Sequence, residues 1–309
     1  MSGNNKTPLK TDAGLGAFYG RYILALLLMG TNGVVAAQIS LFSSQIVLMR
    51  TFIGGVALTA IVLLRGGFSL ENLKSELFDL LLGGIALGMN WITLFGAYRL
   101  LNVSLATLIY YIGPMLVLLL SPWLFGERLT GPKIAAIAIV FVGLLFISGS
   151  IAAEGLSMTG LLYAVASALF YAVLLVFNKR IKRTSGLQTA AIEIDVAFVV
   201  VLIDTLLTVG LPHPLASDIP YLLTIGLINT GLAYMLYFSG LQKLPAQSVA
   251  LISYVDPVSA VFFSSLFLYE KLTVFQIVGA VFIIGGAMIG EYKRKGAGAS
   301  KSRLRRESV

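Results

Sequence analysis

The sequence contains no cysteine and only one histidine, His213. Disulfides, thiolate metal sites and cysteine nucleophiles are therefore excluded, and no cluster of histidine ligands can form. The H-E-x-x-H and G-x-G-D motifs of membrane-embedded enzymes are missing, as is the G-x-x-x-x-G-K-[ST] loop of ATP-driven pumps. We therefore expect no metal, no cofactor and no enzymatic activity. A channel is disfavoured too, because no filter-like motif or ring of charge is visible.

Charge is also scarce, since only 12% of the 309 residues are charged and 58% are hydrophobic. Soluble domains carry roughly 25% charged residues. Apolar runs of about 20 residues between short polar breaks predict transmembrane helices. We expect an all-α integral membrane protein, embedded in the lipid bilayer. The ten predicted spans are residues 17–37, 43–64, 77–98, 104–125, 133–150, 158–178, 187–210, 219–240, 247–268 and 273–291.

The net charge of +8 lies mainly in short loops and near the C-terminus, which indicates membrane orientation and not nucleic-acid binding. If the N-terminus is cytoplasmic, the opposite side carries little positive charge beyond Arg99 and Lys271. Both termini are therefore predicted to lie in the cytoplasm, with the chain in the plasma membrane. The cytoplasmic cations would be Lys6, Lys10, Arg65, Lys74, Arg128, Lys133, Lys179, Arg180, Lys182, Arg183, Lys243 and those of the tail.

A sequence pattern occurs twice, 143 positions apart. Pro114, Ser121, Glu127 and Leu129-Thr130 match Pro257, Ser264, Glu270 and Leu272-Thr273. Five spans fall in each half, and an odd number per half makes the two halves insert with opposite orientation. Such inverted repeats are typical of secondary transporters, which bind substrate near the midplane. We predict five-helix halves at 1–150 and 151–292, followed by a basic cytoplasmic tail at 293–309.

The duplicated Tyr, Pro and Glu-Leu-Thr pattern resembles the EamA-type branch of the drug/metabolite transporter superfamily. The stretches 160–180, 231–241 and 279–286 agree with it, so the resemblance covers nearly the whole chain. It implies a transporter that exports or exchanges small metabolites, often amino acids, without ATP. It names no substrate. Alternating access across the plasma membrane is the expected mechanism, by a monomer or a weak dimer.

An importer, or an organophosphate or nucleotide-sugar exchanger of the same superfamily, is the alternative. A phosphate substrate would favour several lysines or arginines inside the spans. We count none well inside a span, so zwitterionic or weakly charged metabolites are favoured. Several tyrosines on one axis would also suit aromatic substrates.

Polar and aromatic residues inside the spans are the candidates for substrate binding. Two glycines flank Thr31-Asn32 in the first span, and a proline removes a backbone donor, so that Pro114 frees the carbonyl of Tyr110. Helix packing explains each feature equally well when it is taken alone. The predicted cavity-lining residues are Asn32, Asn90, Trp91, Tyr110, Tyr163, Tyr234 and Tyr254, with Pro114 and Pro257 as kinks.

Acidic residues inside spans are the sharper signal, because charge in the hydrocarbon layer is costly. Asp256 precedes Pro257 and has no lysine or arginine within four positions, and Asp204 lies deep in the seventh span. Both are candidates for proton coupling, and a helix-packing carboxyl is the alternative for Asp256. Glu193 and Asp195 are interpreted as partners of the basic loop at 179–183.

Overall fold

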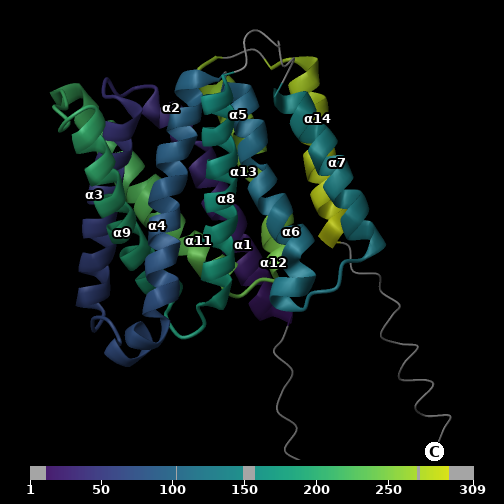
Figure 1. The fold of residues 1–309 in the computed structure, drawn as a ribbon, viewed down its shortest axis with the longest axis horizontal. Helices are drawn as coiled ribbons and strands as arrows, with labels where there is room; N and C mark the ends of the chain where they lie inside the picture. The colour runs from purple at the N-terminus through teal and green to yellow at the C-terminus, as the bar shows by residue number, and fades with distance from the viewer. Residues whose placement is uncertain (1–11, 102, 149–156, 270–271, 292–309) are drawn as a thin grey trace, which may run out of the picture.

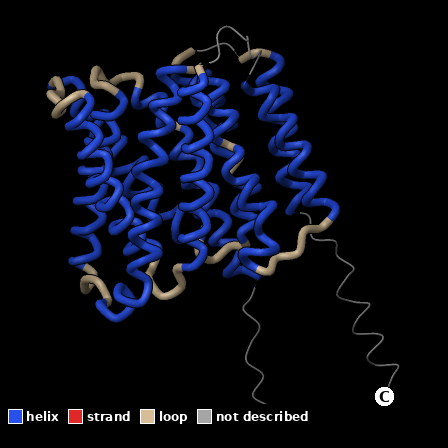
Figure 2. Tube along the Cα trace, viewed as in Figure 1, coloured by secondary structure: helices blue, strands red, loops and turns tan. Residues whose placement is uncertain are grey.

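The computed structural model describes residues 12–101, 103–148, 157–269 and 272–291, and Glu270 and the predicted tail 293–309 lie outside them. Within this part of the chain all regular structure is helical, as Figures 1 and 2 show. The all-α prediction is therefore confirmed. The helices of the first half are α1 (Asp12–Gly30), α2 (Asn32–Ala36), α3 (Ser43–Leu64), α4 (Leu70–Leu100), α5 (Val103–Tyr110), α6 (Ile112–Phe125) and α7 (Gly131–Ser148).

The second half differs in detail, since its first segment is one continuous helix and its third is divided by a π-helix. Its elements are α8 (Met158–Arg180), α9 (Gly186–Thr208), a 3₁₀ turn η1 (Ala216–Asp218), α10 (Ile219–Leu223), the π-helix η2 (Thr224–Leu232), α11 (Ala233–Leu241), α12 (Ala246–Ile252), α13 (Val255–Phe267) and α14 (Val274–Glu291).

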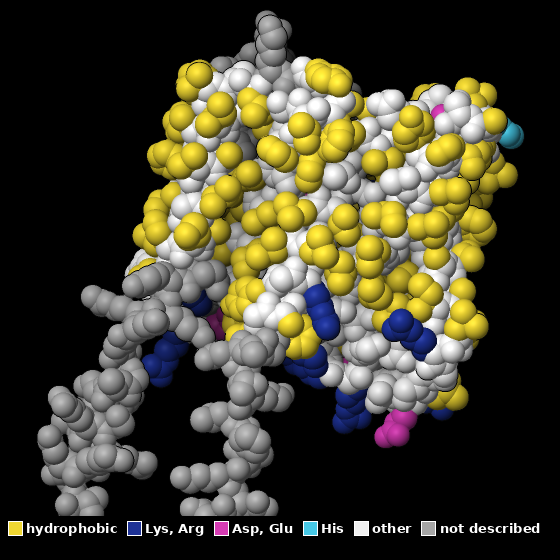
Figure 3. All heavy atoms as spheres, turned by 180° about the vertical axis from the view of Figure 1, so that it is seen from behind, with side chains coloured by type: hydrophobic (Ala, Val, Ile, Leu, Met, Phe, Trp, Pro, Cys, Tyr) yellow, Lys and Arg dark blue, Asp and Glu magenta, His cyan; other side chains and the backbone are white. Residues whose placement is uncertain are grey.

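The helices suit a bilayer in length and composition. In the described residues, seven helical segments of at least 18 residues are apolar enough to cross a membrane, and two shorter apolar helices lie in α7 and α14. Large apolar side chains face outward, and Figure 3 shows them over the middle of the molecule with Lys and Arg near one end. A soluble protein would bury this surface, so the chain is a multi-pass membrane protein.

Helices from the two halves pack directly against each other. α4 lies along α8 and α9, α3 lies along α9, and α1 lies along α11 and α13. α7 and α14 form a pair at one edge of the bundle (Figure 1). The space enclosed between these pairs therefore has walls from both halves.

Three long segments are each divided into two helices. Thr31, Tyr111 and Tyr254 separate α1 from α2, α5 from α6, and α12 from α13, with φ/ψ of −80°/−5°, −73°/0° and −72°/−4°. Pro114 and Pro257 each follow three residues after a break, where the missing N–H and the ring prevent a continuous helix. With a one-residue offset upstream of the prolines, the duplicated sequence pattern predicts that Tyr110 is equivalent to Tyr254. The backbone conformation pairs Tyr254 with Tyr111 instead.

The freed backbone groups find partners across the bundle. The Tyr254 hydroxyl donates to the carbonyl of Tyr111 over 2.8 Å. Asn229, in η2, donates its amide to the carbonyl of Leu28 and to the Thr31 hydroxyl, at 2.7 and 2.6 Å. Broken helices survive in a membrane only where such groups are paired or wet.

Two acidic residues of α9 do not pair with the basic loop, contrary to the sequence interpretation. Glu193 is fully buried and accepts from the Asn178 amide at 2.9 and 3.0 Å, and Asp195 accepts from Thr59 at 2.7 Å. The loop is held instead by Glu76, which accepts the backbone N–H groups of residues 182, 183 and 184. α4 begins at Leu70, whereas the predicted span begins at residue 77, and Glu76 belongs to this additional stretch.

The α7–α14 pair depends on glycine at the point of contact. A Cβ at Gly143 would lie 2.8 Å from the carbonyl oxygen of Gly279 and 2.8 Å from the Ile283 side chain, whereas one at Gly285 meets nothing within 4 Å. We expect Gly143→Leu to destabilise the protein by about 1–3 kcal/mol, the usual cost of overpacking. Thermal unfolding in detergent measures it, with Gly285→Leu as the control. Equal melting temperatures for the two variants would contradict the contact.

Candidate functional site

A cavity of about 550 Å³ lies between the two halves. Arg65, Lys182, Arg183 and Lys243 line one pocket at an end of the bundle, which we call the basic end. Figure 3 shows Lys and Arg side chains gathered near one end of the molecule. The cavity reaches the other end, where the first residue of α3 and Leu272 line it. None of its described lining residues comes from the loops at the basic end. Among the described residues, the lining of the cavity therefore reaches the opposite end and not the basic end.

Most of the predicted residues line this cavity. Five of the seven candidates for substrate binding do so, together with one of the two coupling candidates and one of the two prolines. Asn90 is held in place because its amide donates to the carbonyl of Ser167 over 2.8 Å. Their role in binding stays a prediction. The residues are Asn32, Asn90, Trp91, Tyr110, Tyr234, Asp256 and Pro257.

The other four predicted residues lie elsewhere. Tyr163 is 39% exposed and lines a separate pocket of about 100 Å³ with Asp204 and Arg99. Tyr254 is buried behind Tyr111, against α7 and α14. Pro114 is buried within α6. For Tyr163 the reason is angular, since Tyr171 follows eight residues later at about 80° around the helix and takes the cavity side.

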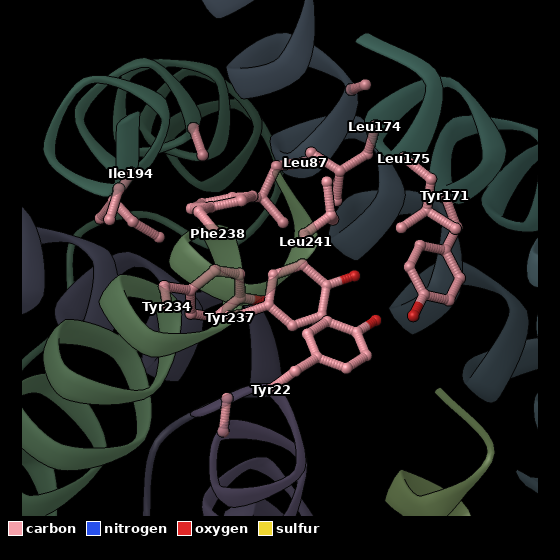
Figure 4. Packing of buried hydrophobic residues seen from close by; sticks show 14 of the residues in the cluster. Tyr22, Leu87, Tyr171, Leu174, Leu175, Ile194, Tyr234, Tyr237, Phe238 and Leu241 are labelled. Atoms are coloured by element: carbon pink, nitrogen blue, oxygen red, sulfur yellow. The ribbon is translucent and has the colours of Figure 1, made fainter. Parts of the chain in front are cut away.

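Aromatic rings form the walls of the cavity. Tyr110 stacks on Tyr171 with centroids 4.9 Å apart and planes 6° apart. Trp91 meets Tyr234 edge-on at 5.8 Å. Figure 4 shows Tyr171 and Tyr237 turned toward the same space. Stacked and edge-on rings in this arrangement accommodate an apolar or aromatic side chain.

Arg50 is the residue that the sequence analysis missed. It lies in the third turn of α3, is 6% exposed and lines the cavity, which corrects the statement that no cation lies inside a span. Its Nε donates to Thr230 Oγ1 at 2.8 Å and its Nη2 to the Asn229 carbonyl at 3.4 Å. The guanidinium sits over the Trp91 ring, 5.3 Å from its centroid. The sequence feature that could have identified Arg50 is its position, because it is the eighth residue of the predicted span 43–64.

Asp256 supplies the negative charge of the cavity. Tyr111 donates its hydroxyl to Oδ2 over 3.0 Å, and no described residue donates to Oδ1. The only salt bridge in the described part of the chain joins Arg180 to Asp79, so Arg50 and Asp256 are not in direct contact. No group of three acidic or histidine side chains suited to a metal occurs among the described residues.

The basic end is closed by contacts between the halves. Glu127, just beyond α6, accepts the backbone N–H groups of Ala246 and Gln247 at 2.6 and 3.0 Å. The Gln247 side chain donates to Ser121 over 2.6 Å and accepts from Lys133. A carboxylate at the N-terminus of α12 is favoured by the helix dipole. These contacts, which we call the basic-end latch, fasten α6 and α7 to α12.

Comparison with curated proteins finds transporters. The uncharacterized transporter YxxF of Bacillus subtilis is 26% identical over 280 residues, covering 89% of this chain and 90% of its own. Proteins named "Probable amino-acid metabolite efflux pump" in Salmonella typhimurium and Escherichia coli are each 28% identical, covering 61% of this chain and 67% of their own. These relatives are named as transporters or efflux pumps.

A solved crystal structure shares the fold, with a TM-score of 0.79 at 22% identity over 89% of this chain and 96% of its own. A family model, the EamA-like transporter family, matches twice, at residues 15–149 and 158–290. The two matches together span well over half of the sequence, and each covers one half of the bundle. The chain belongs to the EamA-like transporter family.

Proposed function

We propose that this protein is a secondary transporter that exports or exchanges amino-acid-like metabolites by alternating access. The cavity carries the proposal, because it lies between the halves, opens toward one end and is closed at the other by the basic-end latch. A site that is reachable from one side at a time is what alternating access requires. A channel would need a path to both ends.

The proposal includes ten spans in two inverted halves, at 1–150 and 151–292. Gly143 meets Gly279, and Gly286 meets Ala136, and a shift of 143 positions converts one contact into the other. Reciprocal contacts of this kind are typical of a two-fold axis. Because the higher number on α7 pairs with the lower number on α14, the helices run antiparallel. This supports an axis perpendicular to them, in the membrane plane.

Orientation and location are also part of the proposal. The excess of lysine and arginine at the basic end supports a cytoplasmic position for that end and for both termini. The chain would then sit in the plasma membrane with its cavity open to the outside, ready to release a substrate brought from the cytoplasm.

Amino acids are favoured over organophosphates by the charges in the cavity. A phosphate group is bound by several cations, whereas Arg50 is accompanied by the carboxyl of Asp256. Two relatives bear the name of amino-acid metabolite efflux pumps. Import of the same metabolites, or exchange of organophosphates, remains the second candidate.

Counterflow in proteoliposomes tests the function. Vesicles containing the purified protein and an excess of one unlabelled amino acid are diluted into a trace of the same labelled amino acid. We expect transient accumulation for at least one member of a panel that includes aromatic and aliphatic amino acids. Empty liposomes are the control. Uptake equal to empty liposomes for every amino acid would remove the assignment.

The same assay can address the aromatic wall. We expect Tyr171→Leu to raise the KM for an aromatic substrate about two- to tenfold, because an aromatic pair contributes about 0.5–1.5 kcal/mol. Tyr163→Leu, on the same helix but outside the cavity, is the matched control. Equal kinetics for the two variants would contradict the placement of Tyr171 against substrate.

A further inference from the structure

Two opposite charges face the same cavity without neutralising each other. Arg50 projects from α3, against η2, and Asp256 lies in the first turn of α13, where it accepts a hydrogen bond from Tyr111. Both line the cavity, and no salt bridge joins them. Charges that are left without a close partner in low-dielectric surroundings are costly. A ligand that pairs with both charges therefore gains binding free energy from each of them.

Arg50 has donors left for a ligand. A guanidinium carries five N–H groups in a fixed planar fork. The described residues accept from Nε and Nη2 only, and Trp91 covers one face of the group. Nη1 and the second hydrogen of Nη2 are therefore available, and two adjacent donors of this kind match the two oxygens of a carboxylate.

Asp256 has acceptor capacity left on the other wall. Tyr111 occupies Oδ2, which leaves Oδ1 for a donor from the cavity. α2 packs against α13, and its Asn32 lines the cavity with a buried carbonyl oxygen that has no hydrogen-bond partner among the described residues. Acceptors without donors suit an ammonium group, which has three N–H donors and accepts nothing.

We propose that Arg50 binds the carboxylate and Asp256 the ammonium group of one zwitterionic substrate, with Asn32 as an additional acceptor. This inference rests on the proposed function, because it concerns recognition in the same cavity. The substrate class is then an α-amino acid or a close analogue, whose side chain lies against Tyr110 and Tyr171. A monocarboxylate leaves Asp256 unpaired, and a monoamine leaves Arg50 unpaired.

Binding can be measured without transport. The chain has two tryptophans, and Trp123 is 81% exposed whereas Trp91 lines the cavity. Trp123→Phe therefore leaves one fluorescent reporter beside the site. The probes are L-phenylalanine, 3-phenylpropionate and phenethylamine, and the parallel series L-leucine, 4-methylpentanoate and 3-methylbutylamine. Within each series only the charged groups differ.

We expect the amino acid to bind at least about 30-fold more tightly than the acid or the amine in one series or both, since loss of one partner from a buried charge pair costs at least this factor. Arg50→Gln should weaken the amino acid and the acid by about 30-fold and leave the amine within about threefold. Asp256→Asn should weaken the amino acid and the amine and spare the acid. Arg65→Gln, at the residue that caps the C-terminus of α3, and Glu71→Gln are controls outside the cavity.

Three results would overturn the proposal. The first is that the acid and the amine bind as tightly as the amino acid. The second is that a variant weakens all three probes equally. The third is that no probe binds in either series. If Arg50→Gln does not fold, Arg50→Lys keeps the charge without the planar fork, and it should retain the preference for the carboxylate at reduced affinity. Selective binding without counterflow would reject the transport function and support this inference. Counterflow without selectivity for the charged groups would support the transport function and reject this inference.

Discussion

Replacing Asp256 by asparagine is expected to abolish gradient-driven accumulation of substrate while exchange continues. Asparagine keeps the shape of the side chain and removes its ability to titrate. A carboxyl in the cavity that holds a proton in one facing state and substrate in the other couples the two flows. We propose that Asp256, and not the other candidate Asp204, carries the coupling proton, so the expected loss of accumulation is complete.

The measurement uses proteoliposomes with and without an imposed pH gradient, at substrate concentrations above the raised Kd of the variant. Wild-type uptake should depend on pH and on the gradient, and the variant should show neither dependence. Tyr111 donates to Asp256, and the other titratable side chains that line the same cavity are Arg50, Tyr98, Tyr110, Tyr171, Tyr234 and Tyr237. Asp204→Asn, in the separate pocket beside Arg99, is the matched control. Gradient-driven accumulation that persists in Asp256→Asn would reject the coupling role and leave exchange untouched.

The fold was largely predictable because the bilayer limits the choices. Backbone groups in hydrocarbon must be paired within the segment, so long apolar runs become helices. α3 spans Ser43–Leu64, the range predicted from the apolar run alone. The breaks were predictable in kind from Gly30, Gly33 and the two prolines. The residue at which each break falls was not, because it depends on hydrogen bonds from distant helices, such as the one from Tyr254 to Tyr111.

The site was less predictable, because residue type does not reveal which face of a helix a side chain occupies. Tyr163 and Tyr171 are chemically identical and lie on the same helix, yet only Tyr171 lines the cavity. Arg50 was missed for a different reason. Its position in the span does not show how deeply the side chain is held, and only the partners Thr230 and Asn229 reveal this. The position of such a side chain depends on polar contacts between distant helices. The sequence of one helix alone does not reveal these contacts.

The basic-end latch yields the second prediction, that Glu127→Gln shifts the protein toward the state open at the basic end. Glu127 accepts two backbone N–H groups of α12, one on each carboxylate oxygen. Glutamine can accept only one of them and loses the charge that favours a helix N-terminus. Hydrogen bonds to a charged group contribute about 1.5–3 kcal/mol. Loss of even the lower value would change the ratio of the two states about tenfold.

Cysteine labelling measures this shift directly, because the chain contains no cysteine of its own. Ser43→Cys places a thiol at the mouth of the cavity, and Phe42→Cys places one on the 64% exposed neighbour outside it. With a membrane-impermeant reagent added outside, we expect Glu127→Gln to slow labelling at residue 43 at least threefold and to leave residue 42 unchanged. Glu71→Gln, an exposed carboxylate at the basic end, should change neither rate. An unaltered rate at residue 43 in folded Glu127→Gln would show that the latch does not set the balance between the two states.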